Sequence, residues 1–181
     1  DIIMYDIYLR TRNNPLSLTT ESSSVSDIRL TFNGLATYPT CAMTNSGLII
    51  VCYEENNVIY SLYTADWGVT ISSVSTLVTS ASCPFIVRDP TSDIIHMIYW
   101  DNTTALITYN YSTDNLSTLN LASPSVVYGS VVGEQQPTLI VYPSGQLIAT
   151  FIRTTGNPLV YSIVSYYSDD YGKTTPWTAV S

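Results

Sequence analysis

One turn pattern recurs along this chain at intervals of about fifty residues, and this repeat constrains the fold more than any other feature. The pattern is a hydroxyl residue, any residue, Asp, any residue, Gly, any residue and Thr. Its strong copies are Thr64–Thr70, Ser112–Thr118 (with Leu in the Gly position) and Ser168–Thr174, each preceded by Tyr. A weaker copy contains Asn13 in the Asp position. Such a period indicates one supersecondary unit that is copied several times.

The segments between these turns have the composition of β-strands. Short runs rich in Val, Ile, Thr and Tyr are separated by Gly, Pro, Asn and Asp, and no stretch with helical spacing is free of these breakers. We therefore predict an all-β protein. In the second repeat the predicted strands are Pro84–Arg88, Ile94–Trp100, Ala105–Tyr111 and Leu116–Leu121. Four antiparallel strands in a repeat of this length are typical of a β-propeller blade.

The repeats divide the chain into half a blade, residues 1–34, and three blades, residues 35–80, 81–130 and 131–181. The half blade is predicted to hold strands three and four, Met4–Thr11 and then either Leu16–Thr20 or Ile28–Phe32. A propeller needs at least four blades to close its ring, and an open ring leaves sheet edges exposed. We therefore expect a larger propeller, completed by another segment of the same polypeptide, by another chain or by further copies. The first of these is our preferred interpretation.

The turn pattern resembles the Asp-box, or BNR repeat, of the sialidase and neuraminidase superfamily. Ser168–Thr174 followed by Trp177 is the fullest match, whereas the first copy has Ile71 in the place of the aromatic residue. We expect the Asp carboxylate to accept hydrogen bonds from turn amides and Gly to adopt a positive φ. In the family this turn joins strands three and four, remote from the ligand face. The residues given this structural role are Asn13, Thr64, Asp66, Gly68, Thr70, Ser112, Asp114, Thr118, Ser168, Asp170, Gly172, Thr174 and Trp177.

A ligand site is expected at the opposite end, where strand two of each blade runs into its loop. Aligning the repeats by eye places Tyr53-Glu54, Trp100-Asp101 and Ile152-Arg153 at equivalent positions. Aromatic rings beside carboxylates and a guanidinium could bind a sugar by stacking and hydrogen bonding. The alternative, which we favour, is that the aromatic residues pack between blades and the charges are solvated. The candidate ligand-binding residues are Tyr53, Glu54, Trp100, Asp101, Glu134 and Arg153.

Catalysis of the sialidase kind is not expected from this chain. The resemblance implies three arginines that clamp the substrate carboxylate, a Tyr/Glu nucleophile pair and an acidic acid/base residue, and the five arginines here do not fall into that pattern. Glu54 and Asp101 could form a carboxylate pair for glycoside hydrolysis, but we interpret them as ordinary loop acids. His96 lies within an apolar run and is interpreted as a packed core residue. No catalytic residue is assigned.

The charge and the cysteines narrow the range of partners. With 14 Asp and Glu against 6 Lys and Arg, the chain lacks the basic surface that binds nucleic acid. It contains no apolar run long enough for a membrane span. Cys41, Cys52 and Cys83 are expected to be buried free thiols, with a Cys41–Cys52 disulfide as the alternative. Their spacing and the single His give no metal site, and no cofactor is expected.

Two functions are compatible with this sequence. The preferred hypothesis is a non-enzymatic structural or glycan-binding propeller on a virion (a phage tail, fibre or decoration protein) or on a cell surface, since a composition poor in Lys and rich in Ser, Thr and Tyr resembles such proteins. Its partners would be other virion or surface proteins, further blades of the same polypeptide, and glycans. The alternative is a fragment of a sialidase-like glycoside hydrolase whose catalytic residues lie in further blades.

Overall fold

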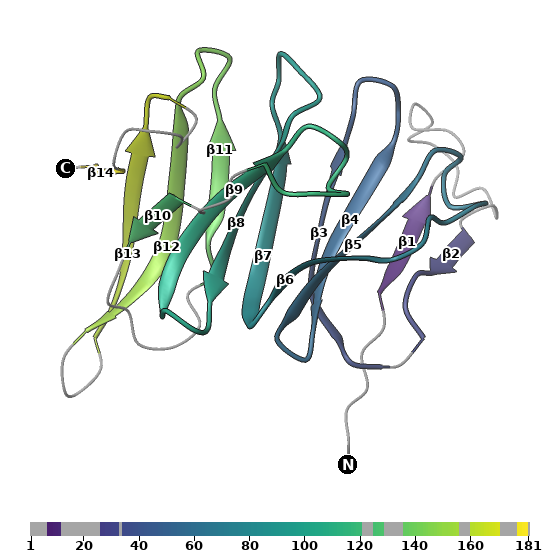
Figure 1. Ribbon diagram of the computed structural model, residues 1–181, viewed down its shortest axis with the longest axis horizontal. Coiled ribbons are helices and arrows are strands. Elements are labelled where there is room, and N and C mark those ends of the chain that lie inside the picture. The colour runs from purple at the N-terminus through teal and green to yellow at the C-terminus, as the bar shows by residue number, and fades with distance from the viewer. Residues whose placement is uncertain are drawn as a thin grey trace, which may run out of the picture.

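The computed structural model describes residues 7–11, 26–32, 34–120, 125–128, 136–155, 160–170 and 177–180, and these form β-strands and no helix (Figure 1). Accordingly, these residues contain no apolar helix that could cross a membrane. The strands form one two-stranded and three four-stranded sheets, all antiparallel. The prediction of an all-β chain with propeller-like blades is therefore confirmed.

Each four-stranded sheet is built from strands that are consecutive in the chain, and we call these sheets the first, second and third blades. Their strands lie side by side across the molecule (Figure 1). The two-stranded sheet consists of β1 (Tyr8–Thr11) and β2 (Ser26–Arg29). The first blade comprises β3 (Ala36–Met43), β4 (Ile49–Glu55), β5 (Val58–Thr64) and β6 (Ser75–Thr79). The second blade comprises β7 (Ala81–Arg88), β8 (Ile95–Asp101), β9 (Leu106–Ser112) and β10 (Ser125–Tyr128). The third blade comprises β11 (Thr138–Val141), β12 (Leu147–Thr155), β13 (Val160–Ser168) and β14 (Thr178–Ala179).

The hydrophobic core lies between neighbouring blades rather than inside one of them. One face of the first blade, including Ile50 and Ile59, packs against Ile86 and Met97 of the second. The second blade repeats this arrangement against the third, where Ile107 belongs to the same cluster as residues of β11 and β12. A third cluster joins the two-stranded sheet to the first blade. The first and second blades therefore bury apolar side chains on both faces, which explains why β4 and β8 are buried along almost their whole length.

The turns divide into two ends of the molecule. Turns between the second and third strands, at residues 56–57 and 102–105, lie at one end, which we call the loop end. Turns between the first and second strands and the repeated hydroxyl-x-Asp turns lie at the other, which we call the Asp-turn end, because Thr64 pairs with Ile49 and Ser112 pairs with Ile95. In Figure 1 the Asp-turn end is at the top and the loop end at the bottom.

The fourth strand of the second blade lies later in the chain than predicted. Residues 116–120 are turns and bends, and the strand is β10, Ser125–Tyr128. Leu116 has a φ of 59° and donates its amide hydrogen to the Ser112 hydroxyl, which ends the extended conformation there. The prediction of a strand over Leu116–Leu121 was wrong for residues 116–120, because the hydroxyl-x-Asp turn extends to Thr118; Leu121 lies outside the described residues.

A bulge interrupts the first strand in the first and second blades, directly before its proline. The strand pairing shifts between Thr37 and Thr40 and again between Ser82 and Phe85. In all three blades the residue before the proline has a positive φ, at 49° for Tyr38, 51° for Cys83 and 42° for Gln136. Proline lacks an amide hydrogen for the ladder and is confined to sheet edges and bulges, and the first strand is an edge strand of its sheet.

All three cysteines are free thiols, as expected, but only Cys52 and Cys83 are buried. Cys41 is exposed, so the prediction of three buried thiols was wrong for this residue. Complete burial raises the pKa of the Cys52 thiol. The disulfide alternative fails because Cys41 pairs with Val51, and Cys52 pairs with Thr40, in the β3–β4 ladder.

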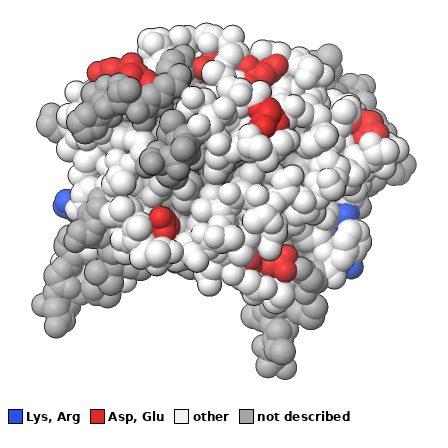
Figure 2. All heavy atoms as spheres, viewed as in Figure 1, with Lys and Arg blue, Asp and Glu red and all other residues white. Residues whose placement is uncertain are grey.

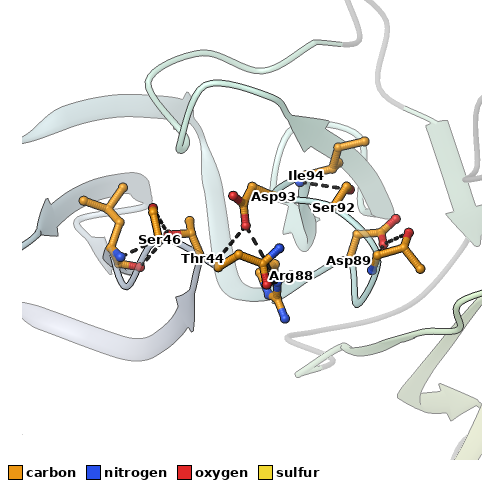
Figure 3. Close-up of polar contacts among 10 residues, drawn as sticks. Thr44, Ser46, Arg88, Asp89, Ser92, Asp93 and Ile94 are labelled. Carbon is orange, nitrogen blue, oxygen red and sulfur yellow. Dashed lines mark hydrogen bonds and ion pairs between the residues drawn. The ribbon is translucent and has the colours of Figure 1, made fainter.

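Polar side chains tie the first and second blades together at the Asp-turn end (Figure 3). Asp93 accepts a hydrogen bond from the amide of Asn45 at 2.7 Å and forms an ion pair with Arg88 at 3.7 Å. Arg88 also donates to the side-chain oxygen of Asn45. Arg88 is thus part of a contact between two blades, at the end opposite the expected ligand face.

Candidate functional site

The hydroxyl-x-Asp turns form closed hydrogen-bond networks within themselves. In the first, Asp66 accepts bonds from the Thr70 amide (2.8 Å), the Thr70 hydroxyl (2.7 Å) and the Thr64 hydroxyl (2.9 Å). Gly68, at a φ of 92°, donates its amide hydrogen to the Thr64 hydroxyl. The Thr70 amide, the Thr70 hydroxyl and the other donors hold the pKa of Asp66 below its ordinary value.

The second turn repeats this network with different residues. Asp114 accepts bonds from the hydroxyls of Ser112 (2.6 Å) and Thr118 (2.6 Å) and from the Thr118 amide (3.0 Å). Burial raises the pKa of Asp114, but the hydrogen bonds outweigh burial and lower the pKa overall. Leu116 occupies the Gly position with a positive φ and a fully buried side chain. These carboxylates hold their own turns together.

Only part of the third turn can be compared. Ser168 donates its hydroxyl hydrogen to Asp170 at 2.8 Å, as in the other two turns. Trp177 is buried and packs edge-on against Tyr109 of the second blade, with 5.6 Å between the ring centroids. Its indole N–H donates a hydrogen bond to the hydroxyl of Ser125. The remaining predicted turn residues, Asn13, Gly172 and Thr174, lie outside the described residues.

Three predicted ligand-binding residues lie in the interior. Tyr53, Glu54 and Trp100 are between 4 and 7% exposed. Burial and the nearby Glu55 carboxylate raise the pKa of Tyr53 to about 12. Glu54 accepts a hydrogen bond from the amide of Cys83 at 3.1 Å and so links the first blade to the bulge of the second. These side chains join blades and offer almost no surface to a ligand.

The strand pairing also corrects the alignment of Tyr53-Glu54 by one position relative to Trp100-Asp101 and Ile152-Arg153, which remain equivalent to each other. Cys52 pairs with Thr40, Ile98 with Phe85 and Thr150 with Thr138, so Tyr53, Tyr99 and Phe151 are equivalent. Glu54 is then equivalent to Trp100 and Ile152. A shift of one residue moves a side chain to the other face of a sheet. The charged position shared by the three blades is therefore occupied by Glu55, Asp101 and Arg153.

Of the charged candidates, Asp101 caps its own turn, and Arg153 acts electrostatically on one tyrosine, Tyr166. Asp101 accepts hydrogen bonds from the amides of Thr103 (2.8 Å) and Thr104 (3.2 Å). The Nε of Arg153 is buried, and no described residue accepts a hydrogen bond from it. Burial raises the pKa of Tyr166, and the charge of Arg153 opposes that rise. The last candidate, Glu134, lies outside the described residues.

A hollow of about 370 Å³ lies near the loop end, between the first strands of the three blades. Each blade contributes three consecutive residues around its proline: Tyr38–Thr40 from β3, Cys83–Phe85 from β7, and residues 136–138, which begin just before β11. The positive φ before each proline bends the strand at this point. Each of the three blades thus contributes to the hollow through the same local feature, a positive φ directly before a proline.

The lining of the hollow combines flat apolar surfaces with a few uncharged polar groups. Phe85 and the prolines supply the apolar surface, whereas Thr40, Gln136 and Thr138 supply hydroxyl and amide groups. This mixture is typical of sites that hold a small polar molecule with apolar faces. No Asp or Glu is among the described residues that line the hollow. Sequence analysis missed this site, although the repeated X-Pro position before each strand pair was a usable signal.

A buried polar array lies within the second blade. The Nδ1 of His96 is 2.7 Å from the hydroxyl of Tyr109, and its Nε2 is 3.8 Å from the carboxylate of Asp89. His96 is 1% exposed, which agrees with its interpretation as a core residue. Asp89 also accepts bonds from the amide and hydroxyl of Thr91, so the array links β8 and β9 to the β7–β8 turn.

The face seen in Figure 2 carries few charged side chains, and Lys and Arg are rare on it. Among the described residues no cluster of His, Cys, Asp and Glu could hold a metal ion.

Comparison with known proteins identifies the architecture. No protein-family model and no curated protein sequence matches the chain. Among solved structures, the chain resembles a Hadza microbial sialidase (TM-score 0.58, 15% identity, 81% of this chain and 37% of the other). It also resembles an α-L-arabinofuranosidase from Fusarium graminearum (TM-score 0.64, 16% identity, 81% and 48%) and a xylan β-1,4-xylosidase from Bacillus halodurans (TM-score 0.57, 12% identity, 80% and 30%).

These likenesses show the fold and not the activity, because the sequence identities are low. The chain spans less than half the length of each of these three proteins. The chain therefore has a propeller-like fold similar to that of these glycoside hydrolases.

Proposed function

We propose that the chain is part of a carbohydrate-active propeller of the glycoside hydrolase type and that its hollow at the loop end holds a sugar. The observation that carries this proposal is the hollow itself, formed by equivalent residues of three consecutive first strands. The structural neighbours named as sialidase, arabinofuranosidase and xylosidase support it at the level of the fold. They favour the hydrolase fragment over a structural virion protein.

The lining of the hollow suits binding better than bond cleavage. Most glycoside hydrolases use a pair of carboxylic residues at the scissile bond, whereas Glu54 and Asp101 are bonded to backbone amides and do not line the hollow. In the proposed enzyme this chain therefore contributes a sugar subsite, and the acid and base come from other residues. We further propose that the hydroxyl-x-Asp turns are Asp-boxes with a structural role. Location on a virion or cell surface stays a prediction.

Binding of sugars to the 181-residue chain tests this proposal. We expect isothermal titration or NMR titration to detect at least one of sialyllactose, arabino-oligosaccharides and xylo-oligosaccharides. Phe85→Leu, which removes a ring from the hollow but keeps an apolar side chain, should weaken that binding at least tenfold, or by about 1.4 kcal/mol. Gln136→Ala, at an exposed residue, should weaken it without affecting the fold.

The matched control is Trp67→Leu, which removes an exposed ring at the Asp-turn end. Its affinity should equal that of the wild type. Equal loss in Phe85→Leu and Trp67→Leu, or the absence of binding to all three sugar classes, would contradict the proposed site. Turnover of fluorogenic sialosides, arabinofuranosides or xylosides by the chain alone would show that its own residues are catalytic.

A further inference from the structure

The third blade has one apolar face that no other part of the described structure covers. This face is turned away from the second blade and carries Ile163 (78% exposed), Tyr161 (68%), Ile140 (54%), Val180 (51%) and Ile152 (37%). The residues come from β11, β12 and β13 and, for Val180, from directly beyond β14. An apolar patch of this extent on a sheet face marks an interaction surface.

The same position is fully buried in the other two blades. Ile59 pairs with Glu54, Ile107 with Trp100 and Ile163 with Ile152, so these three isoleucines are equivalent. Ile59 and Ile107 are 0% exposed because the next blade packs on them. Ile163 differs only in having no next blade. Its exposure therefore follows from the missing neighbour and not from a different local structure.

The opposite side of the assembly is uncovered in a corresponding way. Cys41 pairs with Val51, Ile86 with Met97 and Leu139 with Ala149, which makes these residues equivalent on the first strands. Ile86 and Leu139 are 2 and 3% exposed, whereas Cys41 is exposed. Met43, two residues further along β3, is 52% exposed. The segment of the two-stranded sheet thus packs on β4 and β5 of the first blade but leaves Cys41 and Met43 of β3 exposed.

We propose that the free face of the third blade is an inter-blade interface that receives a further four-stranded blade of the same polypeptide. The occupant must cover β11, β12 and β13 together, as Leu139, Leu147 and Phe151 of the third blade cover the second. On its N-terminal side a second copy of this chain would offer β1 and β2, whose described residues form two strands of four residues each, fewer than the four strands that cover the equivalent face in the first and second blades. The structural neighbours are longer chains, of which this chain covers 37, 48 and 30%, and they agree with a further segment of the same chain.

The first experiment compares Ile163→Lys with Ile107→Lys in the 181-residue chain. We expect Ile163→Lys to leave the melting temperature unchanged within about 1 °C, whereas Ile107→Lys lowers it by about 10 °C or prevents folding. Light scattering should give a mass of about 20.0 kDa for the wild type and for Ile163→Lys. A wild-type dimer that Ile163→Lys dissociates would overturn the proposal in favour of a second copy.

The second experiment uses the protein isolated from its natural source and the same polypeptide produced with the coding sequence that follows residue 181. We expect a natural product heavier than 20.0 kDa, slow hydrogen exchange over β13, and a loss of about 10 °C in melting temperature for Ile163→Lys. Val69→Lys, at a residue 83% exposed in the first hydroxyl-x-Asp turn, is the matched control and should have no effect. A natural product of 20.0 kDa, or tolerance of Ile163→Lys in the longer polypeptide, would overturn the proposal. Neither experiment depends on sugar binding, so the proposed function is tested separately.

Discussion

At the scale of single residues, one carboxylate organises each hydroxyl-x-Asp turn. Asp66 and Asp114 each accept one hydrogen bond from a backbone amide and two from side-chain hydroxyls, and all the donors lie within four residues of the carboxylate. Hydrogen bonds to an ionised acceptor are stronger than those between neutral groups. A local network of this kind is encoded by residue spacing alone, and for this reason the repeat could be recognised in the sequence.

Removing one hydroxyl from the second turn should measure this contribution. Thr118→Val removes the donor to Asp114 and should lower the free energy of unfolding by about 1 kcal/mol, whereas Thr118→Ser keeps the donor and should change it less. Because hydrogen bonding lowers the pKa of Asp114 in the folded state, its contribution is complete above the unfolded pKa of about 3.9 and is lost as the pH falls through the folded value. Urea unfolding at pH 7 and at pH 3 should therefore show a smaller difference between the variants at pH 3.

A substitution at Leu116 compares two opposing effects on stability, the backbone strain of the turn and the burial of the leucine side chain. Leu116→Gly relieves a positive φ worth about 1 kcal/mol but empties a fully buried position, which costs about 2–5 kcal/mol, so we expect net destabilisation. The control is Asn115→Gly, at a φ of 60°, where no such side chain is lost and stability should not fall. Chemical unfolding of both variants checks this, and a more stable Leu116→Gly would show that strain dominates.

At the scale of elements, the bulged first strand is the feature that sequence analysis did not interpret. Pro39, Pro84 and Pro137 recur at equivalent positions of the sequence, but their effect on the preceding residue was not predicted. The positive φ at Tyr38, Cys83 and Gln136 bends each first strand toward the hollow. A ladder broken at the same place in consecutive blades produces a concave surface without any long loop.

Glu54 should be important for the bulge of the second blade and not for its own loop. Glu54→Leu leaves the amide of Cys83 without this acceptor in a buried environment, and we expect a loss of about 2 kcal/mol in the free energy of unfolding. Glu54→Gln keeps an acceptor oxygen and should lose less. Glu55→Leu, one residue further along β4, should change stability by less than about 0.5 kcal/mol. Equal effects of the two Leu variants in thermal and urea unfolding would contradict the structural role of Glu54.

At the scale of the whole molecule, stability comes from the contacts between blades. Each blade is a sheet with two apolar faces, so the outermost blades keep one face partly open unless a neighbour covers it. Exposed Cys41 on one side and exposed Ile163 on the other are the clearest signs of this arrangement. The half blade that the repeat analysis expected at the N-terminal side corresponds in position to the two-stranded sheet β1–β2.

Native alkylation should distinguish the open side from the interior. Cys41 should react with iodoacetamide in the folded chain, whereas Cys52 and Cys83 should react only after denaturation, because they are buried and because burial raises the pKa of Cys52. Intact-mass spectrometry should show one adduct before denaturation and three after it, and peptide mapping should place the first at Cys41. In the longer polypeptide proposed above, closure of the ring should protect Cys41 from iodoacetamide. Rapid labelling of Cys52 in the folded chain would contradict the packing between blades.

The sequence by itself determined the strand content and the repeat, because these follow from local patterns: β-branched runs, turn residues and the spacing of Ser or Thr, Asp and Thr. It did not determine which residues form the hollow. A register error of one residue turned Tyr53 and Glu54 to the wrong faces, and only the pairing with Thr37 and Thr40 across the sheet corrected it. The burial of Trp100 and the exposure of Cys41 and Ile163 depend on whether a neighbouring blade is present. Contacts between segments fifty residues apart decide this, and no local pattern encodes them.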